Sequence, residues 1–312
     1  MRAFIFPGQG SQSVGMGVAL SEASRAARDT FEEVDEALGQ KLFRLMAEGP
    51  EDELKLTENA QPAIMANALA VYAALTREGG VDLAKSASFV AGHSLGEYSA
   101  LCAAGTFDLP TTALLLKHRG QAMQAAVPVG VGAMAALLGA DLALAQKIAD
   151  AAAQGETCTV ANDNDPGQVV ISGHKGAIDR AVELAKAMGA KRAILLPVSA
   201  PFHCPLMQPA AEAMDKVFGE TRFDAPAVPL YANVTAQAER DPAAIQRLLV
   251  DQVTGMVRWR ESVTNMGQAG VDEFVELGGK VLGPMVKRTA PEAKVTSVMT
   301  IEDVEALAKE IA

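Results

Sequence analysis

One serine in this chain has the sequence context of a catalytic nucleophile. Residues 92–96 read GHSLG, a G-x-S-x-G pentapeptide that follows the short apolar run at 87–91 and precedes a helical stretch at 97–104. In such a turn from strand to helix the flanking residues must be small, and the serine oxygen projects from the end of a sheet. The pattern predicts that Ser94 is a nucleophile; the alternative is a chance match, since the chain has 27 glycines.

A serine hydroxyl needs a base that removes its proton, and the chain has four histidines. His93 lies inside the pentapeptide, where its side chain is expected to point away from Ser94. His118 lies on the more polar side of an expected helix, and His174 lies in a turn. His203 lies in a proline-flanked loop, and the order of serine before histidine agrees with α/β-hydrolase-like sheets. We therefore expect His203 to be the base; the alternative is a surface histidine without a role.

Arg119 is a second candidate for chemistry. It lies on the apolar face of a helix expected at about 110–126, among Leu115, Ala122, Met123 and Ala126. A guanidinium removed from water is costly unless an anion meets it. We therefore expect an internal carboxylate or an anionic ligand beside Arg119, and the alternative to a ligand is an internal salt bridge or a snorkelling side chain.

Composition and charge limit the classes of partner. The 312-residue chain is 49% hydrophobic, which is ample for a buried core, and its formal charge of -11 argues against nucleic acid or an anionic membrane as a general partner. The apolar stretch at the amino terminus is too short for a signal peptide, and no later segment reaches the ~18 apolar residues that span a bilayer. Three cysteines without a C-x-x-C spacing indicate neither a disulfide framework nor a zinc knuckle. A soluble, cytoplasmic protein is expected.

The elements that must position these residues form an α/β pattern in two parts. A first strand is expected at 2–6, helical patterns at 15–40 and 62–76, and a strand at 87–91. Between Pro128 and Pro197 the order is β-α-β-β-α-β, with strands at 133–138, 157–162, 168–172 and 192–196, helices at 142–153 and 176–188, and a turn at 163–167. Further elements are expected at 205–218, 228–233, 242–250 and 273–288. The prediction is a domain of residues 1–127 and 198–312 with an inserted ferredoxin-like subdomain at 128–197.

Six ordered motifs give the chain a family resemblance: FPGQGSQ at 6–12, GHSLGEY at 92–98, HRG at 118–120, QVVISG at 168–173, SAPFH at 199–203 and VRW at 257–259. In order and spacing the chain resembles the malonyl-CoA:acyl carrier protein transacylases over essentially its whole length. The resemblance implies an α/β-hydrolase-like core with a ferredoxin-like insertion. Two segments depart from the family pattern: Cys204 stands where serine is frequent, and 277–282 lacks a Gly-Pro-Gly form.

The resemblance also implies a set of site residues. It makes Ser94 the nucleophile, His203 its base and later its acid, and Arg119 the bidentate partner of a free malonyl carboxylate. The main-chain carbonyl of Gln252 is expected to orient the histidine. The remaining site residues are the main-chain N–H groups of Gln9 and Leu95, which form an oxyanion hole, and Gln9, Met123 and Phe202, which contact the acyl group. Phe202 is expected to narrow the pocket against α-branched acyl groups.

The reaction that the resemblance implies is a ping-pong transfer. Malonyl-CoA forms a malonyl-serine ester, and the phosphopantetheine thiol of acyl carrier protein removes the malonyl group for fatty acid synthesis. This implies no metal and no redox cofactor, with the coenzyme A thioester as substrate, and a monomer is expected. The alternatives are a free-standing acyltransferase of a polyketide or malonate decarboxylase system, a serine thioesterase or esterase, and a non-catalytic carrier-binding module. Candidate cations for carrier docking are Lys191, Arg192, Lys280, Lys287 and Arg288.

Overall fold

The computed structural model describes residues 1–311 and contains two sheets, one in each part of the molecule. The larger sheet has the strand order β10-β9-β1-β2-β7-β8. Its strands are β1 (Arg2–Phe6), β2 (Phe89–Gly92), β7 (Leu230–Tyr231), β8 (Ala238–Glu239), β9 (Glu273–Leu277) and β10 (Lys294–Val298). The neighbours from β10 to β7 are parallel, and β8 is an antiparallel edge strand. Helices cover both faces of this sheet, so the central strand β1 reads as an almost continuous apolar run.

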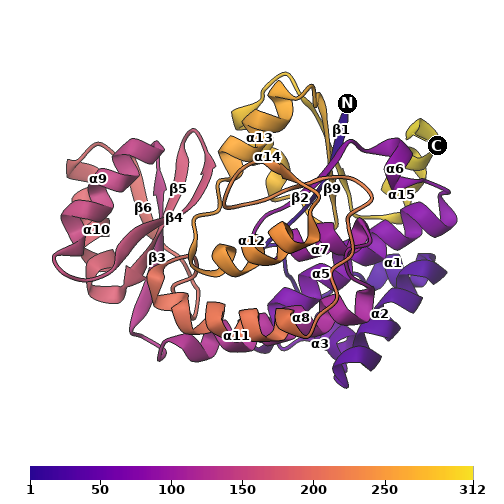
Figure 1. The fold of residues 1–312 in the computed structure, drawn as a ribbon, viewed down its shortest axis with the longest axis horizontal. Coiled ribbons are helices and arrows are strands. Elements are labelled where there is room, and N and C mark those ends of the chain that lie inside the picture. The colour runs from indigo at the N-terminus through magenta and orange to yellow at the C-terminus, as the bar shows by residue number, and fades with distance from the viewer. Residues whose placement is uncertain (312) are drawn as a thin grey trace.

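The smaller sheet forms the part on the left of Figure 1, together with two helices. Its strands pair antiparallel in the order β4-β5-β3-β6. The elements are β3 (Gly132–Leu138), α9 (Leu142–Ala153), β4 (Cys158–Asp165), β5 (Gln168–His174), α10 (Lys175–Ala187) and β6 (Arg192–Leu195). Apolar residues of α9 and α10, among them Ile148 and Ile178, pack on the sheet as a core separate from that of the larger part.

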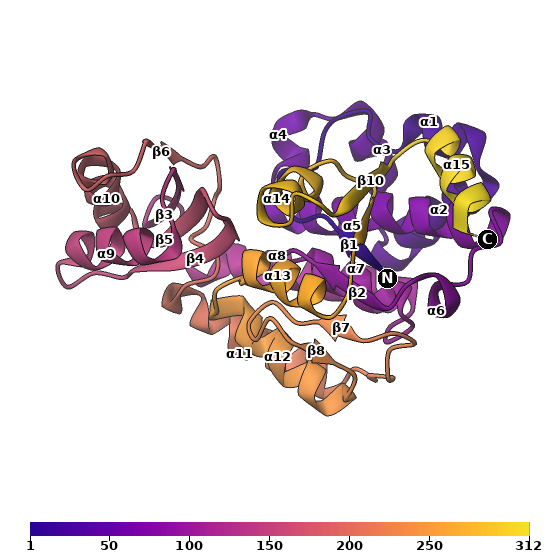
Figure 2. The ribbon, with the colours of Figure 1, turned by 90° about the horizontal axis from the view of Figure 1, so that it is seen from above.

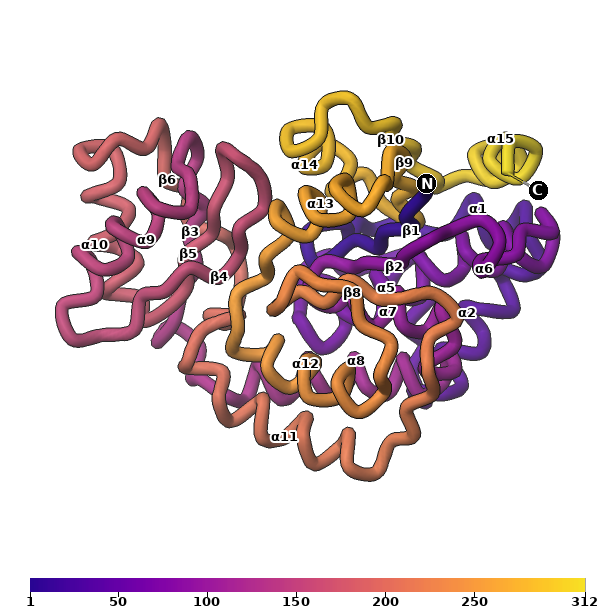
Figure 3. The backbone as a smooth tube through the Cα atoms, turned by 45° about the horizontal axis from the view of Figure 1, so that its top comes forward, coloured from indigo at the N-terminus to yellow at the C-terminus, as the bar shows by residue number. Residues whose placement is uncertain are grey.

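Helices before β2 and after β6 enclose the larger sheet. The first group is α1 (Val18–Ala23), α2 (Arg25–Leu38), α3 (Leu42–Glu48), α4 (Glu51–Leu54), α5 (Thr57–Ala73) with a π-helical end at Ala74–Glu78, and α6 (Leu83–Ser86). The second is α7 (Gly96–Ala103), α8 (Leu109–Ala126), α11 (Gln208–Gly219) after a 3-10 turn at Pro205–Met207, α12 (Pro242–Thr254), α13 (Trp259–Gln268), α14 (Leu282–Thr289) and α15 (Ile301–Ile311). Figure 3 shows α15 at the end of the molecule away from the smaller sheet.

The central helices begin and pack as their sequences dictate. Helix α8 starts at a side-chain cap, because Asp108 accepts the N–H of Thr111, and Pro110 occupies the first turn, where its missing N–H costs nothing. Helix α5 is buried along nearly its whole length and packs against α8. As a result, the side chain of Arg119 on α8 faces the interior between α5 and the carboxyl ends of the strands.

Strand β4 joins the smaller part to the larger one. Asn162 bridges Val257, and the carboxylate of Asp163 pairs with Arg260 of α13 at 2.8 Å. Asp165 pairs in the same way with Arg288 of α14 at 2.7 Å. Both aspartates are buried, so each carboxylate needs such a partner. Arg288, one of the candidate docking cations, is therefore partly committed to an internal ion pair.

The expected secondary structure was wrong in three places, and the ion pairs explain the first of them. The turn expected at 163–167 is confined to Pro166 and Gly167, because β4 continues through Asp165 and its aspartates are paired rather than solvated. The strand expected at 228–233 shortens to Leu230–Tyr231. The segment 259–268, for which no element was expected, forms α13.

Within the described residues, no helix is both long and apolar enough to cross a membrane.

A buried carboxylate supports the start of α14. Glu276, at the end of β9, is fully buried, and its two oxygens accept the N–H groups of Val281, Leu282 and Gly283 at 2.8–3.0 Å. Burial raises the pKa of Glu276, and these three N–H groups oppose that effect. We expect Glu276→Gln to lower the free energy of unfolding by about 1–3 kcal/mol, because the new amide NH₂ must face N–H donors. Urea denaturation followed by circular dichroism measures this loss, and an unchanged midpoint would contradict it.

Candidate active site

Ser94 lies in the sharp turn that joins β2 to α7, at a backbone φ of 54°. The glycines on either side of it are required by close contacts. A Cβ on Gly92 would lie 1.9 Å from the carbonyl carbon of Gly96, and a Cβ on Gly96 would lie 2.2 Å from the main-chain oxygen of Phe6. The turn therefore has room only for glycine at these two positions, and the serine is held at the carboxyl end of the sheet, as a nucleophile elbow requires.

The structure brings Ser94 and His203 together, 109 residues apart in sequence. The hydroxyl Oγ of Ser94 lies 2.7 Å from Nε2 of His203. The other ring nitrogen, Nδ1, lies 2.8 Å from the main-chain oxygen of Gln252 and 3.2 Å from that of Gly255. Since carbonyl oxygens only accept, they hold the proton on Nδ1 and leave the lone pair of Nε2 for the serine hydroxyl. The pair can therefore remove a proton from Ser94 without a carboxylate partner.

The surroundings keep His203 neutral. Burial lowers the pKa of His203 to about 3, with a further lowering by the charge of Arg119, while the carbonyls of Gln252 and Gly255 oppose both effects. A neutral imidazole is the form that can accept a proton. The ring is thus in its basic form over the whole neutral range.

Arg119 points toward the same serine from α8 and is only 1% exposed. Its Nη1 donates to Oε1 of Gln61 at 2.7 Å, and its Nη2 donates to Oε1 of Gln252 at 2.9 Å and to Oγ of Ser94 at 3.2 Å. The guanidinium also lies 5.5 Å from the ring centre of Tyr98. Among the described residues Arg119 forms no ion pair, so the internal salt bridge considered from the sequence is not what holds it. A buried cation with neutral partners is suited to an anionic ligand.

A network of amides and one carboxylate connects these groups, and sequence reasoning missed most of it. Asn233 accepts the main-chain N–H of Ser94 through Oδ1 at 2.8 Å and donates to the oxygen of Gly92 at 2.7 Å, so it supports the elbow on both sides. Glu97, in the first turn of α7, accepts from the side chain of Gln252. The acidic residue directly behind the pentapeptide was a visible signal for Glu97, whereas Asn233 belongs to a distant loop and carries no local signature.

The two loops expected to form the oxyanion hole lie side by side. Strands β1 and β2 are paired in register up to Phe6 and Gly92, so the loop that contains Gln9 and the turn that contains Leu95 both start at the same edge of the sheet. Contact between them is close: a Cβ on Gly8 would lie 2.6 Å from the main-chain oxygen of His93. Leu95 directly precedes α7, whose first N–H groups favour negative charge.

A cavity of about 220 Å³ opens over Ser94. Gln9 and Phe202 line it from the larger part, and Met134 and Asn162 line it from the smaller sheet. It is therefore enclosed by both parts of the molecule. Met123 lies elsewhere: it is buried, and its sulfur contacts Nε2 of Gln61 at 3.6 Å. The structure thus places Met123 against Gln61, one of the residues that hold Arg119, and not among the residues that line the cavity.

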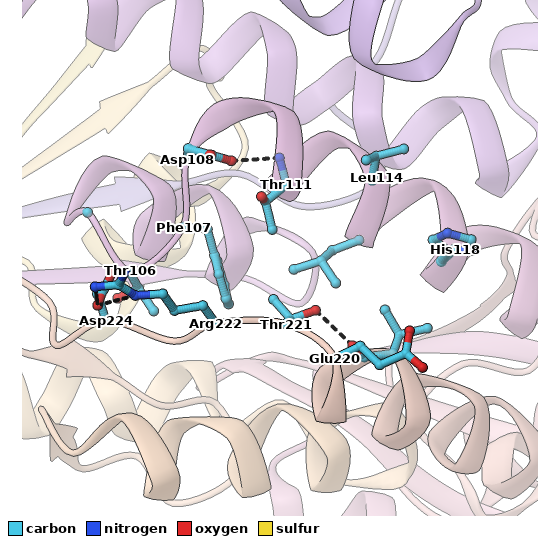
Figure 4. A pocket seen from close by; sticks show the side chains of 13 residues that line it. Thr106, Phe107, Asp108, Thr111, Leu114, His118, Glu220, Thr221, Arg222 and Asp224 are labelled. Carbon is cyan, nitrogen blue, oxygen red and sulfur yellow. Dashed lines mark hydrogen bonds and ion pairs between the residues drawn. The ribbon is translucent and has the colours of Figure 1, made fainter.

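The other three histidines lie apart from the pair of Ser94 and His203, and two of them have partners of their own. The ring of His93 lies on the cavity wall, but its Nε2 lies 2.8 Å from Oδ1 of Asn164 on β4. His174 accepts the N–H of Thr157 in the smaller sheet. His118 lies in a larger cavity, of about 760 Å³, between α8 and the end of α11 (Figure 4).

The larger cavity contains no such pairing of a nucleophile with a base among the residues that line it. Arg222 pairs with Asp224, and the carboxylate of Asp108 is used to cap α8, as the dashed lines of Figure 4 show. Across residues 1–311 no cluster of histidine, cysteine and carboxylate side chains has the composition of a metal site.

Fold and site together define a class of enzyme: a serine in a strand-to-helix turn at the carboxyl end of a parallel sheet, with a histidine within hydrogen-bond distance and a buried arginine beside it, is suited to acyl chemistry. The family model described as "Acyl transferase domain" matches residues 3–301. The chain is 45% identical over 287 residues to a malonyl CoA-acyl carrier protein transacylase of Escherichia coli K12, covering 92% of each chain.

Solved structures agree with this relationship. An acyl-carrier-protein-S-malonyltransferase from Bartonella henselae superposes with a TM-score of 0.97 at 52% identity, covering 99% of both chains. A malonyl-transacylase solved in complex with a type II PKS acyl-carrier protein has a TM-score of 0.95 at 39% identity, covering 99% of both chains. The chain belongs to the acyl transferase family and, within it, to the malonyl-CoA:acyl carrier protein transacylases, so the resemblance stated from its motifs is confirmed.

The low pKa of His203 predicts an unusual pH dependence for the reactivity of Ser94. The ring of His203 is the predicted base and can accept a proton only when neutral, so a lowered pKa extends the reactive form toward acid. We expect the rate at which a fluorophosphonate labels Ser94 to stay level from pH 8 to about pH 5. A histidine with an ordinary pKa of 6.5 would lose about tenfold by pH 5.5. Mass spectrometry of the intact chain measures the labelling, with Ser94→Ala as the unlabelled control. A fall with a midpoint between pH 6 and 7 would contradict the prediction.

Proposed function

We propose that the protein transfers the malonyl group from malonyl-CoA to the phosphopantetheine thiol of acyl carrier protein, and so supplies the extender unit for fatty acid synthesis. The observation that carries this proposal is the position of Arg119. Its guanidinium lies 3.2 Å from Oγ of Ser94, the atom that His203 also contacts. A nucleophile, a base and a buried cation thus converge on one oxygen atom, which suits an acyl group that carries its own carboxylate.

The first half-reaction is acylation of Ser94. His203 takes the hydroxyl proton at Nε2 while Oγ attacks the thioester carbon of malonyl-CoA. The resulting oxyanion is stabilised by the main-chain N–H groups of Gln9 and Leu95, which we assign as the oxyanion hole. When the carbon–sulfur bond breaks, the proton on His203 goes to the departing thiolate, and coenzyme A leaves as the thiol.

The second half-reaction runs the same steps in reverse order. The thiol of the phosphopantetheine arm gives its proton to His203 and attacks the malonyl-serine ester. The ester bond breaks, the proton returns to Oγ of Ser94, and the malonyl group leaves on the carrier as a new thioester. One thioester is exchanged for another, so the chemistry needs no metal and no redox cofactor.

Arg119 selects the acyl group. A planar guanidinium matches a carboxylate through two parallel hydrogen bonds, a geometry that the point charge of lysine cannot copy. The amide oxygens of Gln61 and Gln252 hold the guanidinium in place without neutralising its charge. Phe202, on the cavity wall, is proposed to limit the space beside the α-carbon of the acyl group.

We further propose the finer description of the fold: an α/β-hydrolase-like core, residues 1–127 and 198–312, with a ferredoxin-like insertion at 128–197. The order β4-β5-β3-β6 supports the insertion. Numbered within the smaller part, it is second-third-first-fourth, the arrangement in which a β-α-β-β-α-β chain forms an antiparallel sheet. A cytoplasmic location and a monomeric state remain predictions.

A polyketide or malonate decarboxylase system is the alternative pathway, and a relative solved with a type II PKS carrier protein makes it a concrete one. Preference between purified carrier proteins of the two pathways would separate them.

A thioesterase or esterase would use the same Ser94 and His203 but release the acid to water. Incubation with malonyl-CoA in the absence of a thiol acceptor tests this alternative. The transferase is expected to accumulate a stable malonyl adduct, seen in the intact mass and absent in Ser94→Ala, whereas continuous release of malonate would overturn the proposal.

Substitution of Arg119 tests the selectivity directly. Arg119→Ala removes a charge-assisted contact worth roughly 1.5–3 kcal/mol, so we expect malonyl-CoA to lose about 10- to 100-fold in kcat/KM relative to acetyl-CoA. Arg119→Lys keeps the charge without the planar fork and is expected to recover only part of the preference. Arg222→Ala, which removes an exposed arginine of the larger cavity, is the matched control. An unchanged malonyl-to-acetyl ratio in Arg119→Ala would show that this residue does not select the carboxylate.

A further inference from the structure

Glu97 is a buried carboxylate that the transfer reaction, as described, does not use. It lies three residues after the nucleophile, is only 1% exposed, and belongs to the first turn of α7. Its Oε2 accepts from Nε2 of Gln252 at 2.5 Å, and its Oε1 accepts the main-chain N–H of Asn233 at 3.3 Å. Both oxygens therefore face donors, an arrangement that an ionised carboxylate satisfies.

Gln252 connects Glu97 to each reacting group. The Nε2 end of its amide donates to Glu97 and to the main-chain oxygen of Ser94 at 2.9 Å, while the Oε1 end accepts from Arg119. The main-chain oxygen of the same residue accepts from His203. Gln252 thus contacts Ser94 and Arg119 through its side-chain amide and His203 through its main-chain carbonyl.

The orientation of this amide matters because its two ends have opposite chemistry. If the amide turned over, its NH₂ would face the guanidinium of Arg119, which can only donate, and its oxygen would face Glu97, which can only accept when ionised. Turning it over therefore exchanges two favourable contacts for two unfavourable ones. Glu97 and the main-chain oxygen of Ser94 both favour the orientation in which Gln252 offers an acceptor to Arg119.

We propose that Glu97 is a positioning residue for malonyl selectivity: its carboxylate fixes the amide of Gln252, and the amide fixes the guanidinium of Arg119. This inference rests on the proposed function, because it concerns the acyl group that Arg119 binds. In this role Glu97 transfers no proton, since it contacts neither Oγ of Ser94 nor the ring of His203.

The placement of the two buried side chains supports the proposal. Arg119 and Glu97 are both buried, and Gln252 separates them, so an ionised Glu97 compensates the charge of Arg119 without forming a direct ion pair. Burial raises the pKa of Glu97 to about 8, while the hydrogen bonds from Gln252 and Asn233 and the charge of Arg119 oppose that rise, so the carboxylate form that the proposal requires predominates above about pH 8. Because Glu97 does not pair directly with Arg119, no carboxylate of residues 1–311 occupies the edge of the guanidinium that faces Ser94.

The test is the isosteric variant Glu97→Gln. The new side chain offers one oxygen where two donors converge, and its NH₂ opposes either Asn233 or Gln252. Turning over the amide of Gln252 relieves the second conflict but presents NH₂ to Arg119. We expect kcat/KM for acylation of Ser94 by malonyl-CoA to fall by about 10- to 100-fold, mostly through KM, while acylation by acetyl-CoA changes by less than about threefold.

Glu276→Gln is the matched control, because it also replaces a buried carboxylate that accepts main-chain N–H groups, but at the start of α14. It is expected to lower stability and leave the malonyl-to-acetyl ratio unchanged. Glu97→Asp keeps a carboxylate on a side chain that is one methylene shorter, and it replaces Glu97→Gln in the test if that variant does not fold. Its malonyl-to-acetyl ratio is expected to fall several-fold. A ratio equal to that of the wild type, in whichever variant folds, would overturn the role of Glu97. A wild-type protein that forms no malonyl-Ser94 would instead overturn the proposed function.

Discussion

The desolvated guanidinium of Arg119 is the constraint on which the arrangement of the site depends. A buried cation needs hydrogen-bond acceptors for its N–H groups. The fold supplies them to the two Nη atoms, from α5 through Gln61 and from α12 through Gln252, and leaves Nε buried without a hydrogen-bond partner in the described part of the chain. Because amide oxygens are neutral, they hold the guanidinium without cancelling its charge. The need for neutral acceptors explains why the side chains that contact Arg119 beside Ser94 are the glutamines Gln61 and Gln252.

The second constraint is the register of the parallel sheet. Strands β1 and β2 end together, so the Gln9 loop and the elbow meet at one edge, and the glycines at 8, 92 and 96 allow contacts that a Cβ would block. The smaller sheet then closes the site from the other side. Its edge strand β4 is held by the ion pairs of Asp163 and Asp165 and by the bridge at Asn162, and the same strand supplies Asn164 to His93. Stability at this junction and the shape of the cavity therefore depend on the same strand.

Whether a site residue could be predicted from the sequence depended on how far along the chain its partners lie. Ser94 has a local signature, Arg119 lies on an apolar helical face, and His203 follows by comparison with three other histidines, so each could be singled out before their convergence was visible. Gln61, Asn233 and Glu97 could not be assigned in the same way, because their roles come from pairings between segments up to 155 residues apart. The family resemblance supplied Gln252, but only for its carbonyl, and not for the amide that contacts Arg119.

The elements that were missed have the same cause. Helix α13 carries few apolar residues, and its sequence, WRESVTNMGQ, is stabilised by packing of Trp259, Val263 and Met266 against the sheet rather than by a clear local pattern. Asp163 and Asp165 read as turn residues because aspartate favours turns. Their arginine partners lie 97 and 123 residues away, and with those charges paired the segment can continue as a buried strand. Tertiary pairing overrode local preference at each of these places.

The use of a main-chain carbonyl to orient His203 agrees with the anionic acyl group proposed for this site. Serine enzymes commonly orient the histidine with a carboxylate, which also stabilises the protonated ring. Here a carboxylate beside His203 would lie close to Arg119, compete with the substrate for it and repel an anionic acyl group. The carbonyls of Gln252 and Gly255 orient the ring without adding charge, and the acidic residue of the network, Glu97, stays behind Gln252. Because the charge of Arg119 contributes to the low pKa of His203, a carboxylate bound to Arg119 would offset that contribution. An acyl group that carries a carboxylate is therefore expected to raise the pKa of His203, and an uncharged acyl group is not.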